Sequence, residues 1–214
     1  MRYLIVCGGK IDKEFGLNEI KTDGIDAIIA ADSGMDFLYE NGVTPDIIVG
    51  DFDSTTTNAL EYFERKGQTE IRRLNPIKDD TDTEYAIRLA ISEGARSIVL
   101  LGATGSRIDH VLGNISLLGI GLESGTDISI IDTNNRIRMA DKPVTIEKSA
   151  QYGRFVSLIA LTDDNEVSLK GFKYPVTDSS FDRFTSLGIS NEIVDDHALI
   201  DIHRGKFIII ESKD

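Results

Sequence analysis

Residues 44–55 read TPDIIVGDFDST, and the organisation of the chain can be worked out from them. The segment Ile47–Val49 is apolar and β-branched, which is typical of a strand buried on both faces of a parallel sheet. Gly50 follows, and then Asp51 and Asp53. Because alternate residues of an extended chain point the same way, we expect these two carboxylates to face one point. Carboxylates held that close repel each other, so Mg²⁺ with a phosphate on its other side fits the pair.

A lone D-x-D motif has a second interpretation, because Asp is common in loops, where its side chain bonds backbone amides and starts turns or helices. The two interpretations differ in what they predict for the other strands. Independent loop acids would be scattered over both edges of a sheet. Acids of one site would all follow the carboxyl ends of its strands, where ligands of open parallel sheets bind.

Strand and helix patterns alternate through the first 131 residues. Short apolar runs predict strands at residues 3–6, 27–31, 47–49, 97–101 and 128–131, and a further strand is expected at residues 70–74. Helices are expected to begin near Phe37, Asn58, Thr81 and Ile108. In the last of these, helical spacing is shown by Ile108, Val111, Leu112, Ile115 and Leu118.

The pattern changes after residue 131. Strand-like runs follow one another without a helical pattern between them, at residues 144–146, 155–161, 166–169, 201–204 and 207–210. This predicts an α/β fold with an open, parallel, Rossmann-like sheet, followed by an all-β part. The boundary is expected between residues 132 and 142, and we divide the chain into domains 1–135 and 136–214.

Chemically useful residues gather at one predicted edge of the sheet. No P-loop sequence and no G-x-G-x-x-G run is present. Several carboxylates, a lysine, an arginine and two glycine-rich turns are what a site for Mg²⁺ and a polyphosphate requires. The predicted strand ends carry Gly8-Gly9, Asp32, Asp51 with Asp53, Lys78 with Asp79 to Asp82, and Gly105 with Arg107 and Asp109.

Helix starts account for part of this pattern. Ser33 with Asp36, and Thr81 with Glu84, have capping-box spacing. The turn after residue 101 feeds a helix N-terminus, which is a ready anion site, and Arg107 adds a positive charge there. For His110 in the first helical turn, a hydrogen-bonded structural role is favoured over that of a base.

Composition limits the class of partner. The 214 residues suit one large domain or two small ones, and 36 acids against 23 bases give a net charge of −13. The electrostatic field of a protein with this negative charge repels polyphosphate backbones, so neither nucleic acid nor an anionic membrane is expected as a partner. A small phosphorylated substrate would need a metal or local bases to offset the acids.

Cysteine usage and hydropathy indicate a location. Cys7 is the single cysteine, which excludes an internal disulfide and a cysteine-based zinc site and suits a reducing cytosol. The apolar run before Cys7 is too short for a signal peptide, and no run approaches the roughly 20 apolar residues of a membrane span. We therefore expect a soluble cytoplasmic protein.

Four motifs occur in order along the chain. They are Asp32-Ser33-Gly34, Pro45-Asp46-x-x-x-Gly50-Asp51-Phe52-Asp53-Ser54, Lys78-Asp79-x-Thr81-Asp82 and Gly102-x-x-Gly105-x-Arg107-x-Asp109-His110. Together they resemble the motifs of the thiamine pyrophosphokinase family. The resemblance implies an α/β nucleotide-binding catalytic domain joined to a small β-sandwich that binds thiamine and dimerises. It also implies a homodimer that transfers the diphosphate of ATP to the hydroxyl of thiamine with Mg²⁺, giving thiamine diphosphate and AMP.

The resemblance also implies roles by position. The catalytic set is Asp51, Asp53, Asp79, Asp82, Arg107 and Asp109, of which Asp51, Asp53 and Asp82 are the metal ligands. Nucleotide or phosphate contacts fall to Gly8, Gly9, Asp32, Ser33, Lys78, Thr104, Gly105 and His110, and thiamine contacts to Ser190 and Asn191. Asp79 or Asp82 is our hypothesis for the proton acceptor. The chain has no tryptophan, so the candidates for stacking on thiamine are Phe181, Phe184 and Tyr174.

Two alternatives are left open. The run from Ile47 to Thr55 also fits the D-x-D-x-T pattern of haloacid-dehalogenase-type phosphatases, although two predicted strands precede it here and that family usually has the motif after its first strand. The other alternative is a non-catalytic nucleotide-binding or Ca²⁺-binding module, which would leave Arg107 and Lys78 without a purpose.

Overall fold

The computed structural model describes residues 1–52, 58–75 and 80–214. The chain divides into two compact units, Met1–Thr133 and Asn134–Asp214, and each is described by itself. None of the helices in the described residues is long and apolar enough to cross a membrane.

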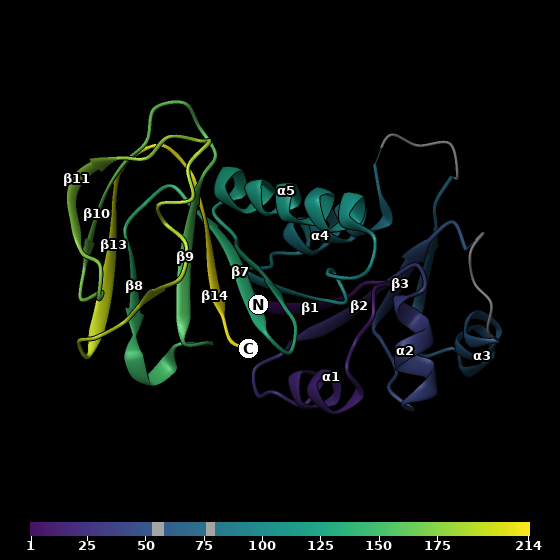
Figure 1. The fold of residues 1–214 in the computed structure, drawn as a ribbon. Coiled ribbons are helices and arrows are strands. Elements are labelled where there is room, and N and C mark those ends of the chain that lie inside the picture. The colour runs from purple at the N-terminus through teal and green to yellow at the C-terminus, as the bar shows by residue number, and fades with distance from the viewer. Residues whose placement is uncertain (53–57, 76–79) are drawn as a thin grey trace. The chain divides into compact units, whose positions relative to one another are not determined.

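The first unit is built on a parallel sheet with strand order β6-β5-β1-β2-β3-β4. Of these strands, β1, β2 and β3 are labelled in Figure 1. Because β1 pairs with β2 on one side and β5 on the other, the strand order reverses between β1 and β5, which is where open parallel sheets bind ligands. Each predicted strand of this unit is confirmed to within one residue. The strands are β1 (Arg2–Val6), β2 (Ala27–Ala31), β3 (Ile47–Gly50), β4 (Glu70–Arg73), β5 (Ser97–Leu101) and β6 (Asp127–Ile131).

Helices cover both faces of this sheet, which explains why its central strands are uninterrupted apolar runs. In Figure 1, α4 and α5 lie on one face and α1, α2 and α3 on the other. Val6 and Ile48 of the sheet belong to one core cluster with Leu38 and Phe63 from helices. The helices are α1 (Lys13–Ile20), α2 (Gly34–Glu40), α3 (Ala59–Lys66), α4 (Asp82–Ser92) and α5 (Ile108–Ser124).

Two local expectations were wrong. The sequence analysis assigned no helix to α1, yet Asp12 caps it by accepting a hydrogen bond from the Phe15 amide at 2.9 Å. The predicted capping box of Ser33 is absent, because Ser33 has helical dihedral angles and its side chain makes no cap hydrogen bond. At α4, Thr81 does accept from the Glu84 amide at 3.2 Å.

The α5 helix differs from expectation in its surroundings. Its helical spacing is confirmed, and it ends at Gly125, whose φ of 72° is the left-handed conformation common after helices. Two of its apolar residues do not lie in the core of this unit. Ile108 and Leu112, one turn apart, are 65% and 59% exposed.

The second unit contains two antiparallel sheets that share one core. Val156 and Phe207 from one sheet and Val167 and Ile200 from the other belong to the same buried cluster. The first sheet has the order β12-β9-β14-β7, with β7 (Asn135–Ala140), β9 (Phe155–Ala160), β12 (Asn191–Glu192) and β14 (Phe207–Ser212). The second has the order β11-β10-β13-β8, with β8 (Val144–Glu147), β10 (Glu166–Lys170), β11 (Val176–Ser180) and β13 (His197–Arg204).

Three of these strands were not predicted. β7 alternates polar and apolar residues and lies where the sequence analysis expected the domain boundary, whereas β11 and β12 are polar. Glu211 on β14 explains why β7 carries arginines. The Glu211 carboxylate is fully buried and accepts hydrogen bonds from Arg136 at 2.7 and 2.9 Å and from Arg138 at 2.9 Å.

Candidate functional site

A cavity of about 910 Å³ opens at the carboxyl ends of β1, β2 and β5. Its position agrees with the reversal of strand order between β1 and β5. Ten of the predicted site residues line it, namely Gly8, Gly9, Asp32, Ser33, Asp82, Thr104, Gly105, Arg107, Asp109 and His110. Three others, Asp53, Lys78 and Asp79, lie outside the described residues.

Main chain forms the floor of this cavity. The Gly9 amide donates to the carbonyl oxygen of Gly102 at 2.8 Å, which joins the ends of β1 and β5. A Cβ atom at Gly9 would collide with the carbonyl oxygens of Gly102 and Thr104, and one at Gly8 would collide with the Ser33 hydroxyl. These glycines therefore allow backbone segments to approach one another where a ligand would approach them.

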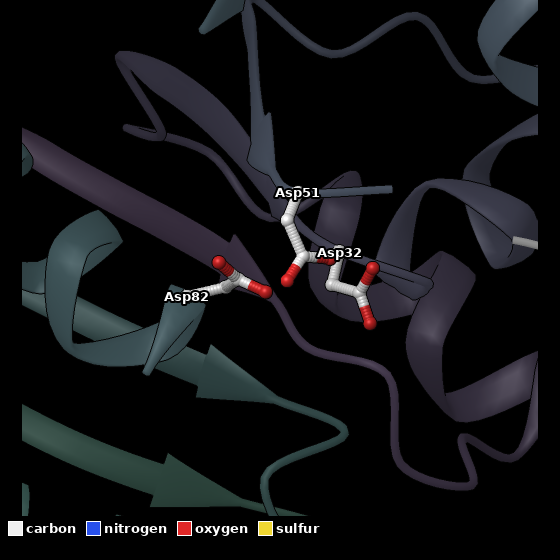
Figure 2. Close-up of side chains that lie close together, drawn as sticks. All are labelled: Asp32, Asp51 and Asp82. Carbon is white, nitrogen blue, oxygen red and sulfur yellow. The ribbon is translucent and has the colours of Figure 1, made fainter. Parts of the chain in front are cut away.

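Three carboxylates meet beside the cavity. Asp32 follows β2, Asp51 follows β3 and Asp82 begins α4, and each offers an oxygen within 4.8 Å of the others (Figure 2). All three are half-buried, so their mutual repulsion is only partly screened by water. Asp51 and Asp82 were predicted as metal ligands, whereas Asp32 was expected among the nucleotide contacts. The geometry places Asp32 with the other two.

The carboxylate group suits a hard divalent cation. Mg²⁺ binds oxygen ligands at about 2.1 Å, so two oxygens on one ion lie about 3 to 4 Å apart. The three side chains need only small movements to reach that spacing. Two residues here have left-handed backbone, Asp32 with φ 49° and Phe52 with φ 63°, a conformation that costs a non-glycine residue energy and is often found at functional sites.

Arg107 and Asp109 form an ion pair at the rim of the cavity. The Arg107 Nη2 atom lies 2.6 Å from Asp109 Oδ2, and both side chains are exposed. The hydrogen bond from Arg107 lowers the pKa of Asp109 below its ordinary value. We had placed Asp109 in the catalytic set with the predicted metal ligands, but the group of three carboxylates does not include it.

The loop between β5 and α5 is fixed at two points. The Thr104 hydroxyl donates to Asp132 Oδ2 at 2.9 Å, and the amide of Asn114 on α5 donates to the carbonyl oxygen of Ala103 at 2.7 Å. Asn114 also lines the cavity, and the sequence analysis missed it. The sequence did contain an indication that Asn114 belongs to the site. Asn114 lies four residues after His110 and therefore on the same face of the helix.

Two further residues that the sequence analysis did not assign to the site line the cavity at the end of β1. Cys7 is buried, and this burial raises the pKa of its thiol to about 11, so the thiol is neutral near pH 7. Lys10 is exposed and follows Gly8-Gly9 directly. The sequence indicated a role for Lys10, because a basic residue directly follows a glycine pair at the end of a strand.

In the second unit, the predicted thiamine contacts lie where a turn leads into β12, with Ser190 in the turn and Asn191 in the strand. Ser190 has a φ of 59°, and its amide donates to the Ser157 hydroxyl at 3.0 Å. The buried Asn191 side chain accepts from the Tyr174 amide at 3.0 Å and donates to its carbonyl oxygen at 2.9 Å. Of the three candidate stacking residues, Phe181 is buried and packs on Phe207 in the core, whereas Phe184 and Tyr174 are exposed.

Comparison with known proteins gives consistent matches over both units. Residues 21–130 match the family model "Thiamin pyrophosphokinase, catalytic domain", and residues 143–207 match "Thiamin pyrophosphokinase, vitamin B1 binding domain". Thiamine pyrophosphokinase of Bacillus subtilis (strain 168) is 34% identical over 188 residues, which are 87% of each protein.

Solved structures agree with these matches. The crystal structure of thiamine pyrophosphokinase from Bacillus subtilis has a TM-score of 0.88 at 31% identity, covering 100% of both chains. The thiamin pyrophosphokinase of Geobacillus thermodenitrificans has a TM-score of 0.87 at 29% identity, covering 100% of this chain and 98% of that one. The Candida albicans enzyme, at 21% identity and a TM-score of 0.81 over 99% of this chain and 88% of that one, shares the fold.

Proposed function

The chain belongs to the thiamine pyrophosphokinase family, and on this basis we propose that it transfers the diphosphate of ATP to the hydroxyl of thiamine. The products are thiamine diphosphate and AMP, so the enzyme is a kinase of thiamine diphosphate biosynthesis. The observation that carries the proposal is the meeting of Asp32, Asp51 and Asp82 beside a cavity at the strand ends.

The two alternatives are not supported. A haloacid-dehalogenase-type phosphatase would need Asp51 as its nucleophile, but Asp51 follows the third strand, and the family matches extend from residue 21 to residue 207. A non-catalytic binding module would not explain why residues 21–130 match the model of a catalytic domain.

We take residues 1–135 to be a Rossmann-like nucleotide-binding domain. ATP is assigned to the cavity in this part of the chain. Asp32, Asp51 and Asp82 would hold Mg²⁺, with Asp53 added from the sequence motif. When bound, the metal spreads the negative charge that develops during phosphoryl transfer. Hard carboxylate oxygens from three elements fit this role, and no nitrogen or sulfur ligand competes within the group.

The residues around the phosphates would position and neutralise them. Main-chain amides near Gly9 and Gly105 can approach phosphate oxygens closely because neither residue has a side chain. Arg107 supplies a permanent positive charge at the start of α5, and Lys78 is assigned the same task from its motif. Ser33, Thr104 and His110 also line the cavity and complete the proposed nucleotide contacts.

The transfer itself needs a proton acceptor. The thiamine oxygen forms a bond to the β-phosphorus of ATP while the bond from that phosphorus to the oxygen bridging the α- and β-phosphates breaks, and AMP leaves with that oxygen. The hydroxyl proton passes to a carboxylate, because the pKa of an alcohol lies far above neutral pH. Asp82, or Asp79 from the sequence motif, is our candidate for this role.

The second unit would bind thiamine and take part in dimerisation. We propose that residues 136–214 form a β-sandwich in which Ser190 and Asn191 contact thiamine, and that the protein works as a cytoplasmic homodimer. The exposed pair Ile108 and Leu112 supports association, since adjacent apolar side chains are usually covered in the working assembly. Light scattering coupled to size-exclusion chromatography tests this, and a monomer would contradict it.

A product assay tests the activity. The protein is incubated with Mg-ATP and thiamine, and nucleotides and thiamine phosphates are separated by chromatography. We expect thiamine diphosphate and AMP in equal amounts, with AMP formed only when thiamine is present. D82N should lose turnover with its fold intact by circular dichroism. Free phosphate without thiamine diphosphate would contradict the proposal, and wild-type rates in D82N would remove Asp82 from the mechanism.

A further inference from the structure

Lys10 lies at the end of β1, directly after the glycine pair that forms the cavity floor. Its side chain is exposed and lines the cavity. Its backbone lies against the β5–α5 loop, because a Cβ atom built on Gly105 would be 4.0 Å from the Lys10 nitrogen. Lys10 is therefore beside the loop to which we assign phosphate contacts.

The charges of the cavity lining show why Lys10 matters. Arg107, the other Lys or Arg among the described lining residues, is already held by Asp109 at 2.6 Å. The structure gives Lys10 no ion pair with any carboxylate in residues 1–52, 58–75 or 80–214. The charge of Lys10 is thus available to a ligand without the breaking of an internal pair.

Charge is also unevenly distributed across the site. The three clustered carboxylates follow β2 and β3 and begin α4, whereas Lys10 follows β1, on the side toward β5. The cavity therefore has an acidic side that suits a cation and a basic side that suits free phosphate oxygens. A metal-bound nucleoside triphosphate has both kinds of group, because the metal binds only some of its oxygens.

We propose that Lys10 binds a phosphate oxygen of the nucleotide and sets the affinity of the enzyme for it. The inference rests on the proposed function, since it adds a residue to the ATP site. A charge-assisted hydrogen bond from an ammonium group to phosphate is among the stronger polar contacts, so its loss should weaken binding about tenfold or more. Because Lys10 holds the nucleotide before and during transfer, its loss should raise KM for ATP far more than it lowers kcat.

The test is a binding experiment that needs no turnover. Binding of Mg²⁺ with α,β-methylene-ATP, which cannot be cleaved at the bond broken in transfer, is measured by isothermal titration calorimetry. K10A should bind about tenfold more weakly than wild type and K10R within about threefold of it. The matched control is K13A, because Lys13 is an exposed lysine at the start of α1 that does not line the cavity, and it should bind as wild type does.

Three results would overturn the inference. One is wild-type affinity in K10A with an unchanged melting temperature, and another is a wild-type protein that does not bind the analogue. An equal loss in K10A and K13A would also overturn it, because it would indicate only a general field effect. A chain that binds the analogue through Lys10 but makes no thiamine diphosphate would refute the proposed function and leave the nucleotide contact standing.

Discussion

The side-chain amide of Asn114 donates a hydrogen bond to the carbonyl oxygen of Ala103 over 2.7 Å, which ties the β5–α5 loop to the helix that follows it. Thr104 in the same loop is held by Asp132. The loop that presents Gly105 and Arg107 to the cavity is thus braced before any ligand binds. Bracing of this kind reduces the ordering that binding requires.

We predict that N114A lowers kcat/KM for ATP about tenfold, because a lost hydrogen bond lets the loop adopt other conformations. S116A is the control, since Ser116 is an exposed α5 residue whose hydroxyl bonds only its own helix. N114D should fail as N114A does, because a carboxylate cannot donate to Ala103. Steady-state kinetics with Mg-ATP decide the matter, and wild-type kcat/KM in N114A would show that the brace is dispensable.

The three-acid cluster leads to a prediction about stability. In the absence of metal, D32N should raise the melting temperature by about 2 to 4 °C, because it removes one of three repelling charges. The same variant should lose most of the stabilisation that wild type gains from millimolar Mg²⁺. Differential scanning fluorimetry measures both effects. D23N, which neutralises an exposed turn residue away from the cluster, serves as the control.

An equal Mg²⁺-induced shift in D32N and wild type would place the metal away from Asp32. The measurement does not depend on turnover, so it addresses the site rather than the reaction.

The Arg107–Asp109 pair predicts a pH effect. Arg107 lowers the pKa of Asp109, so Asp109 should remain ionised to a lower pH than an ordinary aspartate. A depressed pKa in the folded state stabilises the protein above the unfolded-state pKa, and this contribution is lost as the pH falls through the folded value. The effect on stability is small, because both side chains are exposed.

Carboxyl-carbon NMR titration can follow Asp109 directly. R107Q should raise the pKa of Asp109 toward its ordinary value, whereas R96Q, which removes an exposed arginine that does not line the cavity, should leave it unchanged. If Asp109 titrates alike in wild type and R107Q, the two side chains are not paired in solution.

Glu211 supports a prediction for the second unit. E211Q keeps the size of the side chain but leaves Arg136 and Arg138 without a balancing charge, so we expect a loss of about 3 kcal/mol in the free energy of unfolding. Urea denaturation measures the loss. E192Q is the comparison, because Glu192 also pairs with two bases, Arg154 and Lys173, but does so near the surface, so E192Q should lose much less stability than E211Q does. Equal losses would mean that burial does not set the cost.

Sequence alone predicted the parallel strands. The central strands are covered on both faces and are therefore apolar runs, which are easy to read, whereas β4 at the edge of the sheet is largely polar. Sequence alone missed β7, because the charges of its arginines are balanced by a buried residue, Glu211, that lies more than seventy residues away in the sequence. It also missed Asn114, since the partner of that side chain is a backbone carbonyl that any residue could provide. Asp32 was recognised as a strand-end acid, but its proximity to Asp51 depends on tertiary geometry.

The main-chain floor of the cavity has a consequence for saturation mutagenesis. At Gly9 any replacement places a Cβ atom where the carbonyls of Gly102 and Thr104 already lie, so even alanine should act as a knockout, whereas at Gly8 the Ser33 hydroxyl can rotate away from an alanine. At Lys10, one position further on, substitutions should give a graded series ordered by charge and length. Two adjacent positions would then respond differently, with all substitutions abolishing activity at the glycine and a range of activities at the lysine. Such a difference is expected where main-chain groups form one part of a ligand site and side chains form the next.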